Sequence, residues 1–138
     1  MKIFDKRIKI LIVDDHGSVL ERLERRIGIF WPPDIPVKTT AVYCAGADEA
    51  IEAIKEYHPD ILLLNYAFRG DEKTGRDVAR WIDQKYRTPI RVAAHSDRSE
   101  EDLRQLFRGT ECVKYFICGD RIKEFIEDCT RKEKADGY

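Results

Sequence analysis

The sequence has no excess of charge of either sign and no long apolar run. Its 25 lysine and arginine residues are balanced by 26 aspartate and glutamate residues, so the net charge is −1. Because domains that bind nucleic acid usually carry a basic excess, no nucleic-acid partner is predicted for the chain by itself. The longest apolar runs, IKILIV and DILLL, are far shorter than the ~20 residues that span a bilayer, and no signal peptide precedes them. We therefore expect a cytoplasmic protein with no membrane partner.

Cysteine and glycine are not arranged in patterns that carry chemistry. The four cysteines form no C-x-x-C pair and have no histidine spaced for zinc: Cys44, Cys112, Cys118 and Cys129. In a chain of this size we expect reduced thiols that are packed inside. No glycine-rich phosphate loop is present, which argues against a small flavodoxin-like enzyme or ligand sensor.

The sequence does contain a regular alternation of short apolar runs and amphipathic segments over its 138 residues. Apolar runs of strand length predict strands at 8–13, 37–43, 60–64, 90–95 and 112–118. Apolar residues at three- and four-residue spacing predict helices that contain 19–27, 47–57, 75–86, 99–109 and 121–131. The predicted domain is a single one over residues 1–131. Residues 132–138 show no pattern, and we expect them to be a disordered tail.

Five strand–helix units of this regularity predict an α/β fold, a parallel sheet with helices on both faces and right-handed crossovers. In such sheets the functional side chains gather at the carboxyl ends of the strands. That edge holds Asp14 and Asp15 after the first strand and Asn65 after the third. Residues 93–96 end the fourth strand, and Cys118 ends the fifth.

Four stretches at this edge carry a resemblance to a known family: ILIVDDH, HPDILLLN, TPIRVAAHSD and YFICGD. Over residues 7–131 the chain resembles the receiver domains of two-component response regulators. The resemblance implies a flavodoxin-like doubly wound sheet with strand order 2-1-3-4-5. It also implies a paired acid that binds magnesium and an aspartate that accepts a phosphoryl group from a histidine kinase. A hydroxyl and a lysine then hold the phosphoryl oxygens.

Only the acid pair of that set is present, as Asp14 and Asp15. The resemblance places Asn65 at the phosphoacceptor position, Ala93 at the hydroxyl position and Cys118 at the lysine position. Because an amide has no anionic oxygen to attack phosphorus, Asn65 cannot accept a phosphoryl group. A methyl group cannot hydrogen-bond an oxyanion, and a thiol supplies no fixed positive charge. The sequence therefore predicts a degenerate, atypical form, a pseudo-receiver that keeps the phosphorylation-site geometry without its nucleophile.

The acid pair has two interpretations. A residual, weak Mg²⁺ site would use Asp15, the amide oxygen of Asn65 and the carbonyl of Ala67, because hard cations take oxygen ligands. Alternatively, Asp14 and Asp15 only cap the loop that leads into the next helix. No cofactor is required under either interpretation. Tyr115 matches the aromatic switch position of the family, which has lost its trigger along with the hydroxyl.

The predicted function is that of a non-enzymatic module for protein–protein interaction in signal transduction, independent of phosphorylation. By analogy with the family, a signalling partner or a second copy docks on the face formed by the fourth helix, the fifth strand and the fifth helix. The residues chosen on that face are Arg104, Lys114, Tyr115, Arg121 and Glu124. His16 and His95 also lie at strand ends but belong to no recognisable catalytic motif. Two alternatives stay open: a regulator phosphorylated on another acceptor, and a small flavodoxin-like enzyme or ligand sensor that uses the crevice over the acid pair.

Overall fold

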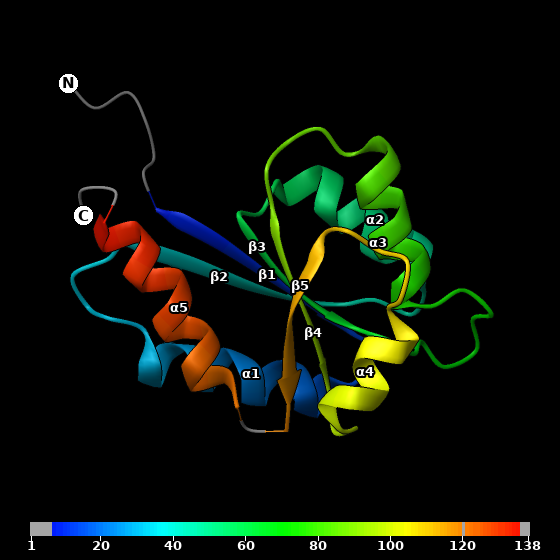
Figure 1. Ribbon diagram of the computed structural model, residues 1–138, viewed down its shortest axis with the longest axis horizontal. Helices are drawn as coiled ribbons and strands as arrows, with labels where there is room; N and C mark the ends of the chain where they lie inside the picture. The colour runs from blue at the N-terminus through cyan, green and yellow to red at the C-terminus, as the bar shows by residue number, and fades with distance from the viewer. Residues whose placement is uncertain (1–6, 120, 136–138) are drawn as a thin grey trace.

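The computed structural model describes residues 7–119 and 121–135, and at its centre lies a sheet of five parallel strands. The strands are β1 (Ile8–Asp14), β2 (Val37–Tyr43), β3 (Ile61–Asn65), β4 (Arg91–Ser96) and β5 (Val113–Cys118). Their order across the sheet is β2-β1-β3-β4-β5 (Figure 1). The predicted flavodoxin-like sheet order is therefore confirmed.

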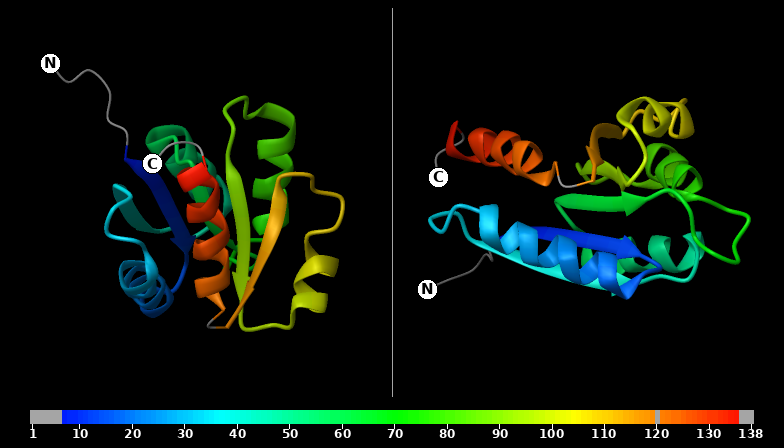
Figure 2. Two further views of the ribbon diagram at one scale, coloured as in Figure 1. Left: turned by 60° about the vertical axis from the view of Figure 1, so that its left-hand side comes forward. Right: turned by 90° about the horizontal axis from the view of Figure 1, so that it is seen from below.

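The helices that connect the strands lie on both faces of the sheet. They are α1 (Gly17–Phe30), α2 (Ala47–Tyr57), α3 (Gly75–Lys85), α4 (Glu100–Leu106) and α5 (Ile122–Ala135). Helices α1 and α5 cover one face, and α2, α3 and α4 cover the other (Figure 2). Helix α5 continues through residues 132–135, which the sequence pattern predicts to belong to the tail, and residues 136–138 lie outside the described residues. Within the described ranges, no helix is long and apolar enough to cross a membrane.

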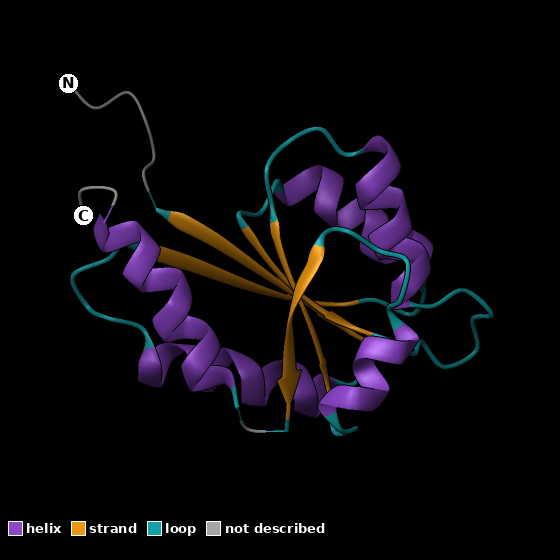
Figure 3. Cartoon of the chain, viewed as in Figure 1, coloured by secondary structure: helices purple, strands orange, loops and turns teal. Residues whose placement is uncertain are grey.

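The inner strands divide their side chains between two apolar layers. Leu62 and Leu64 of β3 pack on the side of α2, α3 and α4, whereas Ile61 and Leu63 pack on the side of α1 and α5. All four side chains are at most 1% exposed. Figure 3 shows the strands between the two groups of helices. Because a strand in a covered parallel sheet is buried on both faces, its sequence is a continuous apolar run.

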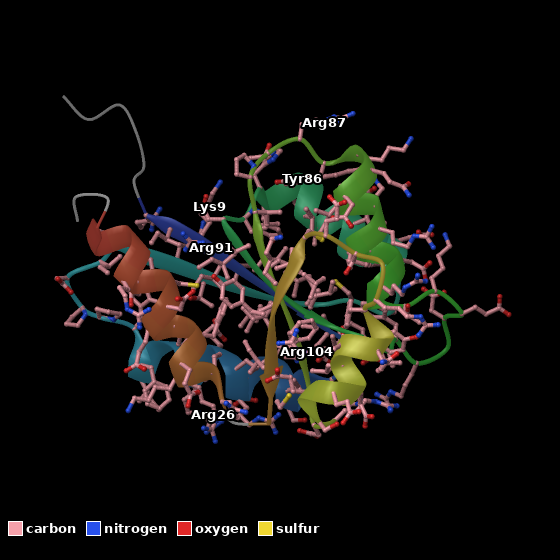
Figure 4. The ribbon with its side chains drawn as sticks, viewed as in Figure 1. Lys9, Arg26, Tyr86, Arg87, Arg91 and Arg104 are labelled. Carbon is pink, nitrogen blue, oxygen red and sulfur yellow. The ribbon has the colours of Figure 1, made fainter. Side chains whose placement is uncertain are left out.

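Arg91 is the one charged residue of an otherwise apolar or polar-ended β4, and it occupies the first position of the strand. Its side chain points toward α5, where Nη1 lies 3.5 Å from the carbonyl oxygen of Cys129 (Figure 4). The pairing of β4 with β5 is irregular between Val92 and Ala93, directly after the arginine. Because of this irregularity, Val92 pairs with Val113 but Ala93 pairs with Tyr115, and Lys114 is passed over.

Helix α3 begins directly against the end of β3. Thr74 caps it with a capping box: its hydroxyl accepts a hydrogen bond from the Arg76 amide at 3.2 Å, and Asp77 Oδ2 accepts one from the Thr74 amide at 2.8 Å. Gly75 follows, and a Cβ at this position would overlap the carbonyl oxygen of Asn65. Glycine at position 75 therefore allows the start of α3 to lie directly against Asn65, the last residue of β3.

Candidate functional site

The acid pair lies at the carboxyl edge of the sheet, because Asp14 is the last residue of β1 and Asp15 follows it. Asp14 and Asp15 are each only 3% exposed. The His16 amide donates to Asp14 Oδ1 at 2.9 Å, and the Arg69 amide donates to Asp15 Oδ2 at 2.6 Å. Asp14 thus supports the loop that leads into α1, whereas Asp15 supports the loop after β3. Helix α1 has no side-chain cap.

His16 joins the two acids. Its Nδ1 lies 2.9 Å from Asp15 Oδ1 and 3.2 Å from Asp14 Oδ1. Burial raises the pKa of Asp14, although hydrogen bonds from His16 work in the opposite direction. For Asp15, burial also raises the pKa, but the Arg69 amide and the nearby His16 outweigh it, so the net shift is downward. The pair therefore holds one carboxylate that ionises easily and one that does so reluctantly.

His95 is the side chain that stands beside Asn65 in the sheet, because the two residues are in register between β3 and β4. The imidazole is buried, and it donates a hydrogen bond to the backbone of Val13, which leaves Nε2 without a partner. That Nε2 lies 3.7 Å from Asp14 Oδ2. Burial, aided by the charge of Arg22, lowers the pKa of His95 to about 4, so the ring is neutral at neutral pH.

Asn65 ends β3 and faces the same floor. Its Nδ2 donates a hydrogen bond to the carbonyl of Ala67 at 2.5 Å, and its Oδ1 is buried without a partner. The predicted cation site needed the oxygens of Asp15, Asn65 and Ala67 to converge. The structure instead pairs the amide nitrogen of Asn65 with Ala67, so these three groups do not present a set of three free oxygens.

Ala93 does not reach this edge. It is fully buried in the layer under α1 and α5, two residues before His95 on the same side of β4. Two residues of a strand span about 6.6 Å, so the methyl group of Ala93 lies well below the site. The hydroxyl near the edge belongs to Ser96, whose Oγ accepts a hydrogen bond from the Arg98 amide at 3.1 Å. The resemblance implies that residue 93 lies beside residue 65. In the structure, the β4 residue beside Asn65 is His95.

The end of β5 also differs from the expectation. Cys118 packs with the layer of α2, α3 and α4, and Gly119 lines the pocket in its place. Burial raises the pKa of Cys118, so it is a thiol rather than a thiolate. Tyr115 faces α5: its hydroxyl donates to Asp128 Oδ2 at 2.7 Å. Burial, and then this hydrogen bond, raise the pKa of Tyr115 to about 12.

The aromatic residue of β5 that faces α4 is therefore Phe116, not Tyr115. The Arg104 guanidinium lies over the Phe116 ring, with Cζ 4.6 Å from the ring centroid. Tyr115 packs instead against the ring of Phe125 on α5, at a centroid distance of 4.9 Å. Because neighbouring residues of a strand point to opposite faces, a shift of one position exchanges the two rings.

A pocket of about 270 Å³ opens beside Asp14 at this edge of the sheet. Its polar and charged lining residues are Asp14, His16, Arg22, Asn65, Tyr66, His95, Ser96, Asp97 and Arg98. Arg22 enters from α1, half-buried, and its Nε has no hydrogen-bond partner among the described residues. Arg98 enters from the loop between β4 and α4. The pocket thus brings two arginines and two histidines together with the buried carboxylate of Asp14.

Sequence reasoning missed Arg22, Arg98 and the role of His95. The signal for Arg22 was available, since it lies three residues after Val19, on the side of α1 that turns toward the sheet. His95 was visible as a histidine at a strand end. The sequence alone does not show to which face of β4 the imidazole of His95 points.

The parallel sheet, its order and the acid pair at its carboxyl edge define a receiver domain of the response-regulator type. The chain belongs to the family described as the cyclic-phosphate processing receiver domain, whose model matches residues 9–109. No protein of curated function matches the sequence.

Solved structures of receiver domains share the fold. The response regulator domain of Thermotoga maritima CheB is 22% identical, with a TM-score of 0.67, over 91% of this chain and 95% of that one. The non-phosphorylated receiver domain of RcsB from Escherichia coli is 11% identical, with a TM-score of 0.70, over 94% of this chain and 95% of that one. At these identities the likeness shows the fold alone.

Proposed function

We propose that this receiver domain is a pseudo-receiver that works without phosphorylation of residue 65, and that its pocket binds and opens a cyclic phosphate ester. The neutral amide of Asn65 supports the first half, because it supplies no nucleophile for phosphoryl transfer. The description of the family as cyclic-phosphate processing supports the second half. The observation that carries it is Arg22, a half-buried guanidinium that lines the pocket with an unpartnered Nε.

Arginine suits this role because its planar guanidinium matches phosphate oxygens and stays charged at any working pH. Arg22 approaches from α1 and Arg98 from the β4–α4 loop, so two sides of the pocket can contact one phosphate. The pocket volume of about 270 Å³ is near the lower limit of small-molecule sites, about 300–1,000 Å³. A cyclic phosphate with part of its sugar fits such a volume, and the remainder of the ligand stays in solvent.

The reaction is hydrolysis of one ester bond. Water adds to phosphorus, one ring P–O bond breaks, and a proton from the water ends on the released sugar oxygen, so a phosphomonoester forms. In this reaction Asp14 and His95, whose lone pairs are buried in the pocket, act as general bases that activate the water. Arg22 neutralises negative charge on the phosphate.

The test uses ³¹P NMR with 2′,3′-cyclic AMP and 3′,5′-cyclic AMP. We expect a monoester resonance to grow with the natural chain, to fall at least tenfold with Arg22→Gln, and to persist with Arg25→Gln, an exposed arginine on the same helix. Saturable binding without turnover would support the non-enzymatic module predicted from the sequence. If neither ester binds, the pocket half of the proposal is wrong.

The phosphorylation half has its own test. After incubation with acetyl phosphate and Mg²⁺, intact mass spectrometry is expected to show no added phosphoryl group, because Asn65 offers no anionic oxygen. A stoichiometric gain of one phosphoryl group would overturn this half and would favour the alternative of another acceptor.

A protein-docking face is the second candidate function. A depression of about 160 Å³ lies between β5 and α5, lined by Tyr115, Phe116, Ile117, Arg121, Glu124, Phe125 and Asp128. Three of the residues predicted for the partner face, Tyr115, Arg121 and Glu124, are among them. Lys114 is exposed nearby on β5, whereas Arg104 is held by Glu100 Oε2 at 2.8 Å. The depression supports docking of a signalling partner or a second copy.

Charge reversal tests this face. Arg121→Glu is expected to weaken self-association in light scattering, or capture of a partner, more than Lys55→Glu on the far helix α2. Equal effects of the two variants would remove the face from consideration.

A further inference from the structure

Three side chains with hydrogen-bond acceptors lie side by side at the carboxyl edge of the sheet. Asp14, Asn65 and His95 lie at the ends of the neighbouring strands β1, β3 and β4, and Asn65 is in register with His95. Each of them follows, by two positions, a residue that packs under α1 and α5, so all three side chains point to that face. His95 Nε2 lies 3.7 Å from Asp14 Oδ2. The three side chains therefore border the same part of the pocket.

The donor ends of Asn65 and His95 are both bound to backbone carbonyl groups. Asn65 Nδ2 donates to the Ala67 carbonyl at 2.5 Å, and the His95 ring donates to the backbone of Val13. Because a carbonyl oxygen only accepts hydrogen bonds, these contacts fix the orientation of the amide and the tautomer of the ring. Asn65 Oδ1 and His95 Nε2 are left as acceptors, and neither has a hydrogen-bond partner within residues 7–119 and 121–135.

The two bare acceptors are complementary to one water molecule. Asn65 is 8% exposed and His95 is 5% exposed, and both line the pocket. Buried polar groups without a protein partner are commonly satisfied by an ordered water where the site is polar and roomy enough. A water molecule occupies about 30 Å³, so the pocket of about 270 Å³ has room for one beside a phosphate group. Water has two hydrogens, one for each of the two acceptors.

We propose that Asn65 Oδ1 and His95 Nε2 hold the water molecule that attacks phosphorus, so that Asn65 positions the nucleophile of the hydrolysis. The inference rests on the hydrolysis proposed above and adds to it a role for residue 65. With one hydrogen donated to each atom, the water keeps its lone pairs for the ester. The guanidinium groups of Arg22 and Arg98 line the same pocket and hold the phosphate there.

The proton and electron balance of the step follows from this arrangement. The water oxygen forms a bond to phosphorus, and the ring P–O bond breaks with its electron pair on the sugar oxygen. The hydrogen held by His95 Nε2 passes to the imidazole and from there to the released sugar oxygen. Asp14 Oδ2, 3.7 Å from Nε2, stabilises the imidazolium that forms in between. Asn65 keeps its hydrogen bond to the other hydrogen and is unchanged.

An amide at position 65 suits this role better than a carboxylate or an apolar side chain. Its oxygen accepts a hydrogen bond without carrying a charge. An aspartate would accept equally well but would repel the phosphate of the ester. A leucine has a similar volume but no acceptor, so it would leave the water held by His95 alone.

The experiment is steady-state kinetics by ³¹P NMR on the full chain, with whichever of the two cyclic AMP isomers the natural chain opens. We expect Asn65→Leu to lower kcat on the order of 100-fold and to leave KM within about threefold of the natural value. Asn65→Asp restores an acceptor oxygen, so its kcat is expected to lie well above that of Asn65→Leu, with a higher KM. Gln105→Leu, which alters an exposed amide on α4, is expected to change neither constant.

Three results would overturn the inference and leave the hydrolysis standing. These are a natural kcat in Asn65→Leu, equal losses of kcat in Asn65→Leu and Asn65→Asp, or a rise in KM alone, which would assign the acceptors to a hydroxyl group of the ester. Circular dichroism establishes that each variant is folded, and Asn65→Ala is judged by the same criteria if Asn65→Leu does not fold. Absence of turnover by the natural chain would overturn the hydrolysis and this inference together.

Discussion

The buried imidazole of His95 makes the stability of the domain depend on pH in a calculable way. Burial lowers its pKa from 6.5 to about 4 in the folded chain. Between these values the unfolded chain binds a proton that the folded chain does not, so acid favours unfolding and stability rises with pH. At 1.36 kcal/mol per pKa unit, the free energy of unfolding should fall by about 2 kcal/mol between pH 7.5 and pH 5.0 through this one group. The contribution is fully present above pH 6.5 and is lost as the pH falls toward 4.

The perturbation that isolates this effect is His95→Gln, which keeps a similar side-chain volume and does not titrate. Urea unfolding in a chelator at pH 7.5 and 5.0 measures the free energy of unfolding of each protein. The natural chain is expected to lose about 2 kcal/mol more than the variant. Asp14, with its raised pKa, is present in both proteins and cancels to first order. His58→Asn serves as the control for removal of an exposed histidine.

The reasoning about His95 is refuted if the natural chain and His95→Gln lose the same stability between the two pH values. Parallel losses would mean that the imidazole is accessible to protons in the folded state. The assignment of a bare Nε2 on the pocket floor would then fall as well.

Two further predictions concern the end of β3. Gly75→Ala should lower the free energy of unfolding by about 3 kcal/mol in urea unfolding, because the added methyl group overlaps the Asn65 carbonyl. Gly17→Ala, which has no atom within 4 Å of the added methyl group, should be neutral or stabilising. Equal effects of the two variants would contradict the close approach of Gly75 to Asn65. Asn65→Asp adds a third carboxylate to the floor, so its melting temperature should fall in a chelator and rise more with a divalent ion than that of the natural chain. An identical ion-dependent shift in both proteins would show that residue 65 and the acid pair do not share a site.

Much of the architecture could be predicted because it depends on patterns that survive without exact register. The continuous apolar runs around Leu11 and Leu63 predict strands covered on both faces, and these strands carry Asp14 and Asn65 to one edge. Any parallel sheet of this order would bring those two ends together. Asp14 and Asn65 accordingly end β1 and β3, two neighbouring strands of the sheet.

The site residues of β4 and β5 are harder to predict from the sequence, because their positions depend on the register of single residues. A strand alternates faces at every step, so an error of one residue exchanges Tyr115 with Phe116. The irregular pairing between Val92 and Ala93 has no signature in the sequence, so the register of β5 against β4 cannot be corrected for it. An alignment that relies on the identity of a hydroxyl or a lysine has no anchor where neither is present.

The changes at the site are consistent with one another when its charge is counted. At an effective dielectric constant of about 20, two like charges 4 Å apart repel by about 4 kcal/mol, so a third carboxylate at residue 65 would require a nearby cation. No lysine is among the residues that line the described pocket, and the cation beside the acid pair is the Arg69 guanidinium, whose Nε lies 3.6 Å from Asp15 Oδ2. The amide of Asn65 carries no charge, and the ring of His95, with its lowered pKa, adds none at neutral pH. The floor therefore holds two carboxylates beside two neutral groups, the Asn65 amide and the His95 imidazole, whereas a phosphoaspartate would require an acid at residue 65 and a positive charge beside it.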